Sequence, residues 1–343
     1  MSGFVAARLR RGPKRLPFLD ARMSTATGDF RSERELIRRI GRELDVSANA
    51  APSGALGSAP VIRFGDDMAQ VALDSPTLIW TTDMLMDGTD FKSAEHGWRA
   101  IGRKAMAVNL SDCAAMAVVP VAALCAVSLN NAMTTDDALE LFRGARDCGL
   151  QVACPIVGGD TNSWDSPTVI CISLAARPDA TAAPVGRDGA RPGDRIYLTG
   201  PVGGSILGRH MTFDPRIEPA LAIAREFHPH AMIDISDGLA IDLGRILELS
   251  GCGAELDETG VKAAIHDDAA RLFERDGVSP LEHALHDGED FELVVVLPPA
   301  ANSETARRLG LIPIGRIVPD GFDLIRDDGR RSVIEPRGWE HFR

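Results

Sequence analysis

Apolar positions recur along the chain with two different spacings, and both spacings occur on either side of residue 180. Helical spacing predicts helices at 33–44, 98–116, 135–148, 219–227, 239–249, 262–276 and 303–309. Short apolar runs bounded by turn residues predict strands at 61–64, 70–73, 78–82, 121–129, 152–157, 169–175, 194–200, 254–256 and 291–297, with further short strands closing the chain. This alternation of strand and helix in both halves predicts an α/β (α+β) fold built as two domains.

A segment rich in Ala, Pro and Gly at 177–193 separates the two sets of elements. We therefore expect an N-terminal domain at 29–180 and a C-terminal α/β domain at 181–343. Residues 1–28 carry none of this periodicity and are predicted to be a disordered leader.

The pattern predicts neither a secretory signal nor a membrane span. The basic stretch at 8–15 has no apolar segment after it. The longest apolar run, 113–129, contains Pro120 and directly follows Asp112, which favours a helix followed by a strand. We expect no membrane partner.

Charge and cysteine content narrow the function classes. The chain carries 37 basic and 49 acidic residues, a formal charge of −12, so a nucleic-acid partner is not expected. An acidic protein can still bind a nucleotide when divalent cations lie between the two. Six cysteines with no C-x-x-C pair indicate reduced thiols and a cytoplasmic protein.

Aspartates stand out because they recur next to apolar runs of the strand type. The clusters are "GDD" (65–67), "TTD" (81–83), "NLSD" (109–112), "GGD" (158–160) and "DISD" (234–237). Four of them follow or adjoin such runs, and ligands of α/β folds bind in the crevice at strand ends. Taken singly, Asp67, Asp83, Asp160 and Asp237 are each explained as turn or helix-cap residues. Taken together, they favour oxygen ligands for Mg²⁺ around the phosphates of a nucleotide.

Asp112 differs because it lies inside a predicted apolar helix. A buried carboxylate needs a positive partner or loses its charge. Lys104 lies eight residues earlier on the same helix, about 12 Å along its axis, so it is not expected to be that partner. Either a positive group lies near Asp112 or the helix faces solvent there, and a metal ion is a natural partner for its carboxylate.

Other nucleotide-binding motifs are missing. The sequence has no G-x-x-x-x-G-K-[ST], so it is not a P-loop protein. It has no G-x-G-x-x-G after a strand, so it gives no support to a Rossmann or protein-kinase fold. The Gly-rich stretch at 200–205 is interpreted as a tight turn.

The ordered motifs resemble those of the thiamine-monophosphate kinase family, which shares the fold of aminoimidazole ribonucleotide synthetase (PurM-like). The motifs are "GDD", "TTDMLMDG", "IGRKAMAVNLSDCAAM", "GGDT", "GRDGARPGDRIYLTG", "MIDISDGLAIDL" and "DGEDFEL", spread from about Gly28 to the C-terminus. The resemblance implies a Mg²⁺-dependent transfer of the ATP γ-phosphate to thiamine monophosphate. It also implies a homodimer in which strands of the N-terminal domains form a barrel.

Site residues follow from the resemblance, motif by motif. It implies magnesium ligands at Asp67, Thr81, Thr82, Asp83, Asp112, Asp160, Asp234 and Asp237, with Asp83, Asp112 and Asp160 catalytic. It implies ATP contacts at Gly159, Asp160, Arg187 and Ser236, and substrate contacts at Asp90, Glu289 and Trp339. Glu289 suits a cationic thiazolium and Trp339 suits stacking on it, although without the family Trp339 is equally explained by packing.

Two departures from the family pattern bear on the site. The family has a histidine where this chain has Asp90, and it has a basic residue after "GGDTT" where this chain reads "GGDTNSWD". Alternatives stay open: another ATP-using enzyme of the same fold acting on a purine precursor or selenide, or a non-catalytic nucleotide-binding relative. The N-terminal reactive cysteine of selenophosphate synthetases and the C-terminal cysteine of hydrogenase-maturation proteins are both missing.

The acceptor of the implied reaction is a phosphate with a second pKa of about 6. It is largely a dianion at neutral pH, so direct in-line transfer needs no protein general base. No histidine lies within the motifs, in agreement with this expectation.

Overall fold

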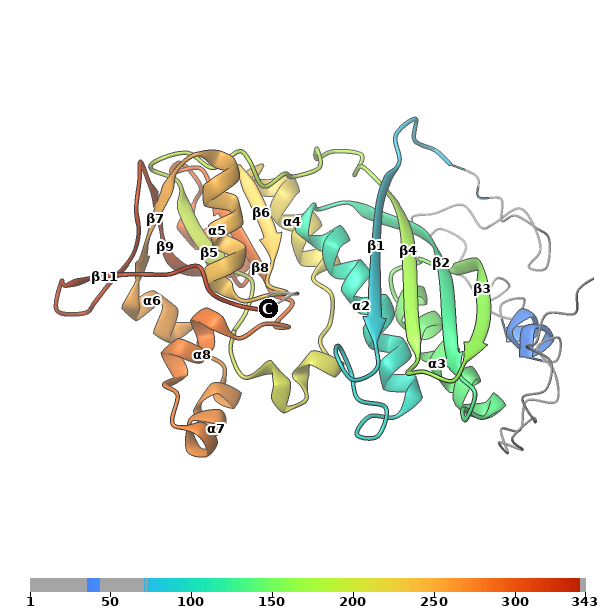
Figure 1. The fold of residues 1–343 in the computed structure, drawn as a ribbon. Helices are drawn as coiled ribbons and strands as arrows, with labels where there is room; N and C mark the ends of the chain where they lie inside the picture. Colours follow the sequence, from blue (N-terminus) through green and yellow to red (C-terminus); the bar gives the residue numbers. More distant parts are fainter. Residues whose placement is uncertain (1–35, 44–70, 72, 340–343) are drawn as a thin grey trace, which may run out of the picture.

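A computed structural model describes residues 36–43, 71 and 73–339, and it contains two β-sheets joined by helices (Figure 1). The first sheet has four strands, β1 (Ile79–Met86), β2 (Val119–Asn130), β3 (Ile156–Trp164) and β4 (Val169–Arg177). Their order is β1-β4-β2-β3. Strand β4 is antiparallel to both β1 and β2, whereas β2 and β3 are parallel and are connected by a helix. The edges of this sheet are therefore β1 and β3.

The second sheet is a mixed sheet of seven strands in the order β11-β10-β7-β9-β5-β8-β6. Its members are β5 (Arg195–Leu198), β6 (Ala231–Asp234), β7 (Gly253–Asp257), β8 (Leu293–Leu297), β9 (Ile312–Val318), β10 (Phe322–Ile325) and β11 (Arg331–Val333). Strand β6 is the edge on the side of the first sheet (Figure 1). This edge strand contacts a helix of the first half of the chain.

Helices cover one face of the first sheet and surround the second. The first half contributes residues 36–43, α2 (Trp98–Ala115) and α3 (Thr135–Leu150). The second half contributes α4 (Ile217–Phe227), α5 (Leu239–Ser250), α6 (Glu258–Ala263), α7 (Asp267–Asp276), α8 (Pro280–His286) and α9 (Ser303–Arg308). Two 3₁₀ turns, η1 (Ser205–Leu207) and η2 (Arg209–Met211), follow the Gly-rich stretch.

Most predicted elements are confirmed, and the exceptions have local causes. The helix expected at 262–276 is two helices, because the chain turns after Ala263 and the His266 side chain accepts a hydrogen bond from Asp268 N to start α7. Helix α8 was missed, although Ser279 caps it and Pro280 occupies its first turn. The strand expected at 152–157 begins only at Ile156.

Five predictions concern residues that are described in part or not at all. The helix expected at 33–44 is described only at 36–43, where it is helical, and residues 71 and 73 of the strand expected at 70–73 are not in a strand. The strand at 61–64, Asp67 and the leader at 1–28 lie outside the described residues.

Helix α2 is the central element of the molecule. It contacts β1, β4 and α3 of the first half and α4, β6 and η2 of the second. Its apolar side chains belong to a buried cluster that continues into α4, β5 and β8. One face of the second sheet therefore shares this core with the first sheet, whereas its other face packs in a second cluster, and a charged side chain that α2 buries in the shared core needs a partner there.

Helices α2 and α3 touch backbone to backbone at two glycines. A Cβ atom at Gly102 would lie 1.8 Å from the Leu141 carbonyl oxygen, and one at Gly144 would lie 1.9 Å from that of Arg99.

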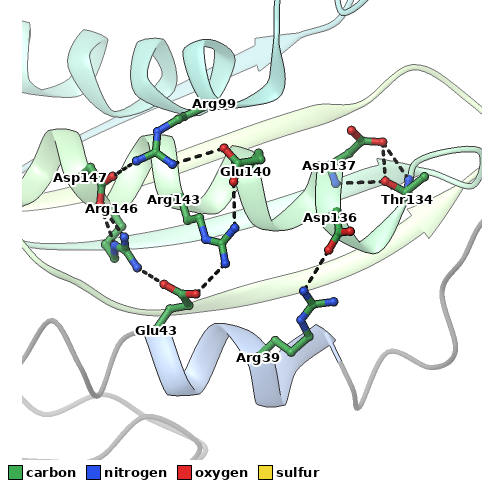
Figure 2. A network of polar contacts seen from close by, with 10 residues as sticks. All are labelled: Arg39, Glu43, Arg99, Thr134, Asp136, Asp137, Glu140, Arg143, Arg146 and Asp147. Atoms are coloured by element: carbon green, nitrogen blue, oxygen red, sulfur yellow. Dashed lines mark hydrogen bonds and ion pairs between the residues drawn. The ribbon is translucent and has the colours of Figure 1, made fainter.

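Beside this crossing, ion pairs join residues 36–43, α2 and α3 (Figure 2). In this network Glu43 accepts hydrogen bonds from both Arg143 and Arg146. These surface pairs add little by comparison with the packing.

The linker that follows the first sheet is anchored to α4. Asp179 accepts hydrogen bonds from Thr181 and Ala182 N and forms an ion pair with Arg225. This arrangement holds the pKa of the Asp179 carboxyl well below its usual range, with the Arg225 hydrogen bond as the largest cause. The segment predicted as a plain linker thus has a fixed path.

We expect Gly144→Ala to lower the free energy of unfolding by about 1–3 kcal/mol, because the added methyl forces the two helices apart. The measurement is chemical denaturation monitored by circular dichroism. Gly97→Ala is the control, since a Cβ there meets no atom within 4 Å and φ is −72°. Equal stability of Gly144→Ala and wild type would contradict the close contact.

Candidate active site

The alternation of strand β1 decides which of its side chains reach the interior. Thr81 and Asp83 are partly buried on the face that packs against α2, whereas Trp80, Thr82 and Met84 are exposed on the opposite face. Thr82 Oγ1 lies 2.9 Å from Ser173 Oγ and 3.2 Å from the Ile172 carbonyl oxygen. The structure therefore separates two residues that the family resemblance assigns to one magnesium set.

Asp112 projects from α2 toward the inner face of β1. Thr81 Oγ1 donates a short hydrogen bond to Asp112 Oδ2. The carboxyl of Asp83 lies close enough to share a proton with that of Asp112. Burial raises the pKa of Asp83 and of Asp112 to about 6, and repulsion by a second carboxylate adds to each shift.

The second half of the chain supplies a third carboxylate. Asp234 ends strand β6, is 4% exposed, and accepts a hydrogen bond from Ser111 Oγ at 2.6 Å. Burial and, to a smaller extent, the charge of Asp112 raise its pKa to about 6. Asp83, Asp112 and Asp234, which we call the carboxylate triad, therefore meet at the contact of α2 with β6.

Arg187 is the cation near this triad. Its charge lowers the pKa of Asp112 and of Asp234, although less than burial raises them. It also borders a cavity of about 430 Å³ beside Asp112, whose other walls are mostly apolar and include Met116, Val185 and Leu249. A crevice that combines an arginine, carboxylates and an apolar wall suits a ligand with an anionic end and a flat apolar end.

The donor chemistry of the triad fits a magnesium ion. Its oxygens are hard ligands, and the mutual repulsion that raises their pKa values would be relieved by a divalent cation. Among the described residues, no three His, Cys, Asp or Glu side chains already converge on one point that could hold a metal. The structure thus brings the three carboxylates close to one another without closing them around a single position, and of the three only Asp112 borders the cavity.

Gly159 and Asp160 lie elsewhere. Both are on β3, which β2 and β4 separate from β1, and Asp160 borders a different, mostly apolar cavity of about 830 Å³. A Cβ atom at Gly159 would lie 1.8 Å from the Cys125 carbonyl oxygen, so pairing of β2 with β3 already requires a glycine there. Within one chain, these two residues are not part of the triad's crevice.

The loop after β6 is tied to helix α5. Asp237 forms an ion pair with Arg245 at 2.5 Å, and its backbone N–H donates to Asp242 Oδ2 at 2.9 Å. Burial raises the pKa of Asp242 to about 7 despite these contacts. The Ser236 carbonyl oxygen accepts a hydrogen bond from Glu289 N at 2.7 Å. Asp237, an expected magnesium ligand, is therefore held by an arginine in this structure.

The three expected substrate residues gather around the same loop. Lys104 Nζ donates at 2.5 Å both to the Asp90 carbonyl oxygen and to Glu289 Oε1. The Asp90 carboxylate itself accepts from Met86 N at 2.7 Å, so it closes its own turn. Trp339 is half exposed, and its backbone N–H donates to the Asp237 carbonyl oxygen at 2.9 Å. Lys104 thus has an anionic partner, which is Glu289 rather than Asp112.

The chain is similar to known proteins in sequence and in structure. Two family models match, "AIR synthase related protein, N-terminal domain" at residues 65–176 and "AIR synthase related protein, C-terminal domain" at 204–326. A curated thiamine-monophosphate kinase of Rhodopirellula baltica is 40% identical over 247 residues, covering 69% of this chain and 76% of that protein. One from Halobacterium salinarum is 35% identical over 301 residues, covering 82% and 96%.

The chain belongs to the thiamine-monophosphate kinase family.

Solved structures agree with this assignment. The thiamine-monophosphate kinase of Stenotrophomonas maltophilia is similar with a TM-score of 0.70 and 27% identity, covering 88% of this chain and 98% of that one. The structure of "AaThiL complexed with AMPPCP and TMP" is similar with a TM-score of 0.69 and 26% identity, covering 89% and 98%. A hydrogenase maturation protein HypE from E. coli is 17% identical with a TM-score of 0.68, which shows the shared fold alone. The predicted PurM-like, two-domain fold is confirmed.

The sequence did not single out two buried residues near this site, Lys104 and His210. Lys104 was considered only as a partner of Asp112, although a lysine within the apolar stretch "IGRKAMAV" signals a buried ion pair. His210 is 4% exposed in η2, and nothing in the local sequence marks it. Its position depends on contacts with residues far along the chain.

We expect Asp112→Asn to lower turnover with ATP by roughly 100-fold or more, because the triad loses a charged ligand. The fold should persist, since Thr81 can still donate to the amide oxygen and one repulsive charge is gone. Steady-state kinetics and thermal melting measure the two effects. Asp136→Asn, at a carboxylate 85% exposed on α3, is the control and should match wild type. Full activity of Asp112→Asn would contradict the role of the triad.

Proposed function

We propose that this chain is an ATP-dependent kinase that phosphorylates thiamine monophosphate to thiamine diphosphate. Family membership supports the reaction, and AMPPCP is an ATP analogue that a related protein binds together with TMP. The observation that carries the proposal is the meeting of Asp83, Asp112 and Asp234 beside Arg187 at the contact between the two halves.

The arrangement suits transfer between two phosphates. Both substrates carry several negative charges, and three carboxylates alone would repel them. The triad with Thr81 would hold Mg²⁺, which when bound offsets charge on the phosphate oxygens. Arg187 adds a fixed positive charge at the same crevice. The acceptor phosphate is largely a dianion above its second pKa of about 6, so in-line attack needs no protein base.

The apolar wall of the crevice supports the nucleotide assignment. Met116, Val185 and Leu249 border the cavity next to Arg187 and Asp112. We propose that the base of ATP packs on this wall while its phosphates extend past Arg187 toward the triad. Ser236 lies on the loop that follows Asp234 at the end of β6.

A homodimer would complete the site. The outer face of the first sheet exposes Trp80, Met84, Met86, Leu124 and Trp164, which is an unusual row of large apolar side chains for a free surface. Both edge strands, β1 and β3, would be covered if two such sheets closed into one barrel. Pairing of β3 with β1 of a second copy would bring Asp160 next to the strand that carries Asp83, on the face of the sheet where Met84 lies.

Two features bear on the cellular compartment of this protein. Among the described residues, no helix is both long and apolar enough to cross a membrane. All six cysteines are free, as expected of a reducing compartment. We keep the cytoplasm as the proposed location.

The decisive measurement is ADP release from ATP in the presence of Mg²⁺ and thiamine monophosphate. We expect release to rise at least about tenfold over a reaction without acceptor, which corresponds to a barrier lowered by roughly 1.4 kcal/mol or more. Thiamine diphosphate should appear in equal amount by chromatography. Thiamine itself is the control acceptor, because it lacks the phosphate nucleophile. No stimulation by thiamine monophosphate would refute the substrate assignment.

The dimer is tested by Met84→Glu. A charge on the outer face should raise the dissociation constant at least about tenfold, since a desolvated carboxylate replaces an apolar contact, and activity should fall with it. Light scattering after size exclusion measures the mass. Val333→Glu, at a residue 79% exposed on β11, is the control and should stay dimeric. A monomeric wild-type protein with full activity would contradict the proposal.

A further inference from the structure

Lys104 is the most deeply buried lysine in the described part of the chain. It lies on α2 and is 1% exposed, with Ala105 and Met106 beside it in the core. A buried ammonium group is costly unless hydrogen-bond acceptors surround it. Lys104 therefore needs fixed hydrogen-bond acceptors. The segments that supply these acceptors are the ones that Lys104 holds in position.

Its two partners come from different halves of the molecule. The Asp90 carbonyl oxygen belongs to the turn after β1, and Glu289 belongs to the loop before β8. Lys104 Nζ donates only to Oε1 of Glu289. Among the described residues, none donates a hydrogen bond to Oε2 of Glu289. The carboxylate is left with one oxygen available to a ligand.

The loop that carries Glu289 is held in a strained shape. Glu289 has φ of +60° and Phe291 has φ of +52°, values that non-glycine residues rarely adopt. Glu289 N donates to the Ser236 carbonyl oxygen, and Phe291 stacks on Phe213 with ring centroids 4.1 Å apart. Strain of this kind persists only where surrounding contacts fix it, and Lys104 supplies one of them.

Histidines complete the surroundings of Lys104. His210 Nδ1 donates to the Ser205 carbonyl oxygen at 2.9 Å, and its ring meets that of His96 edge-on at 5.6 Å. Burial lowers the pKa of His210 to about 4, and the charge of Lys104 contributes. His210 is therefore neutral at physiological pH, and Lys104 is the cation that faces Glu289.

We propose that Lys104 is a positioning residue that holds the Asp90 turn and the Glu289 carboxylate together as one acceptor-binding surface across the two domains. This inference rests on the proposed function. Thiamine monophosphate has a cationic thiazolium ring, and the free oxygen of Glu289 is placed to offset that charge. Without Lys104, the Glu289 carboxylate and the Asp90 turn lose their common anchor. The acceptor site is then affected, whereas the triad and Arg187 are not.

The test compares kinetic constants for the two substrates in Lys104→Met and Lys104→Arg. In Lys104→Met, the KM for thiamine monophosphate should rise on the order of tenfold, while the KM for ATP should change less than about twofold. Lys104→Arg keeps the charge and should recover part of the loss. The double variant Lys104→Met/Glu289→Gln should be no worse than the more affected single variant, since both changes disable one surface.

Arg103→Met is the matched control. Arg103 precedes Lys104 on α2 and also forms an ion pair with the second half of the chain, at Asp214 and 2.7 Å. If Lys104 merely joined the domains, both variants would show the same kinetics. Equal kinetics, additive effects in the double variant, or parallel rises in both KM values would overturn the inference.

The outcomes also separate this inference from the proposed function. A wild-type protein with no activity on thiamine monophosphate refutes both. An active wild type with an unchanged KM in Lys104→Met refutes the inference alone. Should Lys104→Met fail to fold, as judged by circular dichroism, Lys104→Arg and Glu289→Gln carry the test: equal KM rises for both substrates in these two variants would overturn it.

Discussion

The burial of α2 is the constraint on which the rest of the structure depends. This helix lies between the first sheet, α3, α4 and the edge of the second sheet, and it has no broad solvent face. Each polar side chain on it must therefore be paired inside the protein. Lys104 meets Glu289, Ser111 meets Asp234, and Asp112 meets Thr81. These three pairs on α2 lie at the candidate site.

The same helix explains why the site lies between two domains. Its crossing with α3 is fixed by Gly102 and Gly144, which sets the distance of α2 from the first sheet. Its other side packs on α4 and β6, which brings Asp234 to Asp112. The cost of gathering carboxylates in a buried crevice is visible in their raised pKa values. Sites that bind cations and phosphates are arranged in this way, because the ligand supplies the missing charge.

The two ends of the site have different supports. The proposed phosphate end relies on charges from β1, α2, β6 and Arg187, and on a cation that the triad suits. The proposed acceptor end relies on a strained loop, a closed turn and one buried lysine. The Asp90 carboxylate accepts a hydrogen bond from Met86 N and is therefore occupied by its own turn. The neutral His210 lies near Lys104, whose charge helps to lower the pKa of its imidazole.

Sequence alone determined the family, the two-domain α/β fold, most elements and the aspartates at strand ends, because these depend on local periodicity and on motif order. It merged α6 with α7 and missed α8, since a cap and a turn interrupt a continuous polar and apolar pattern. Only the tertiary structure decided which face of β1 packs against α2, that Asp160 lies at the far edge of the first sheet, and that Asp237 pairs with Arg245. The contact of Lys104 with Glu289 joins residues 185 positions apart. Such contacts depend on how sheets and helices pack, and no local spacing encodes them.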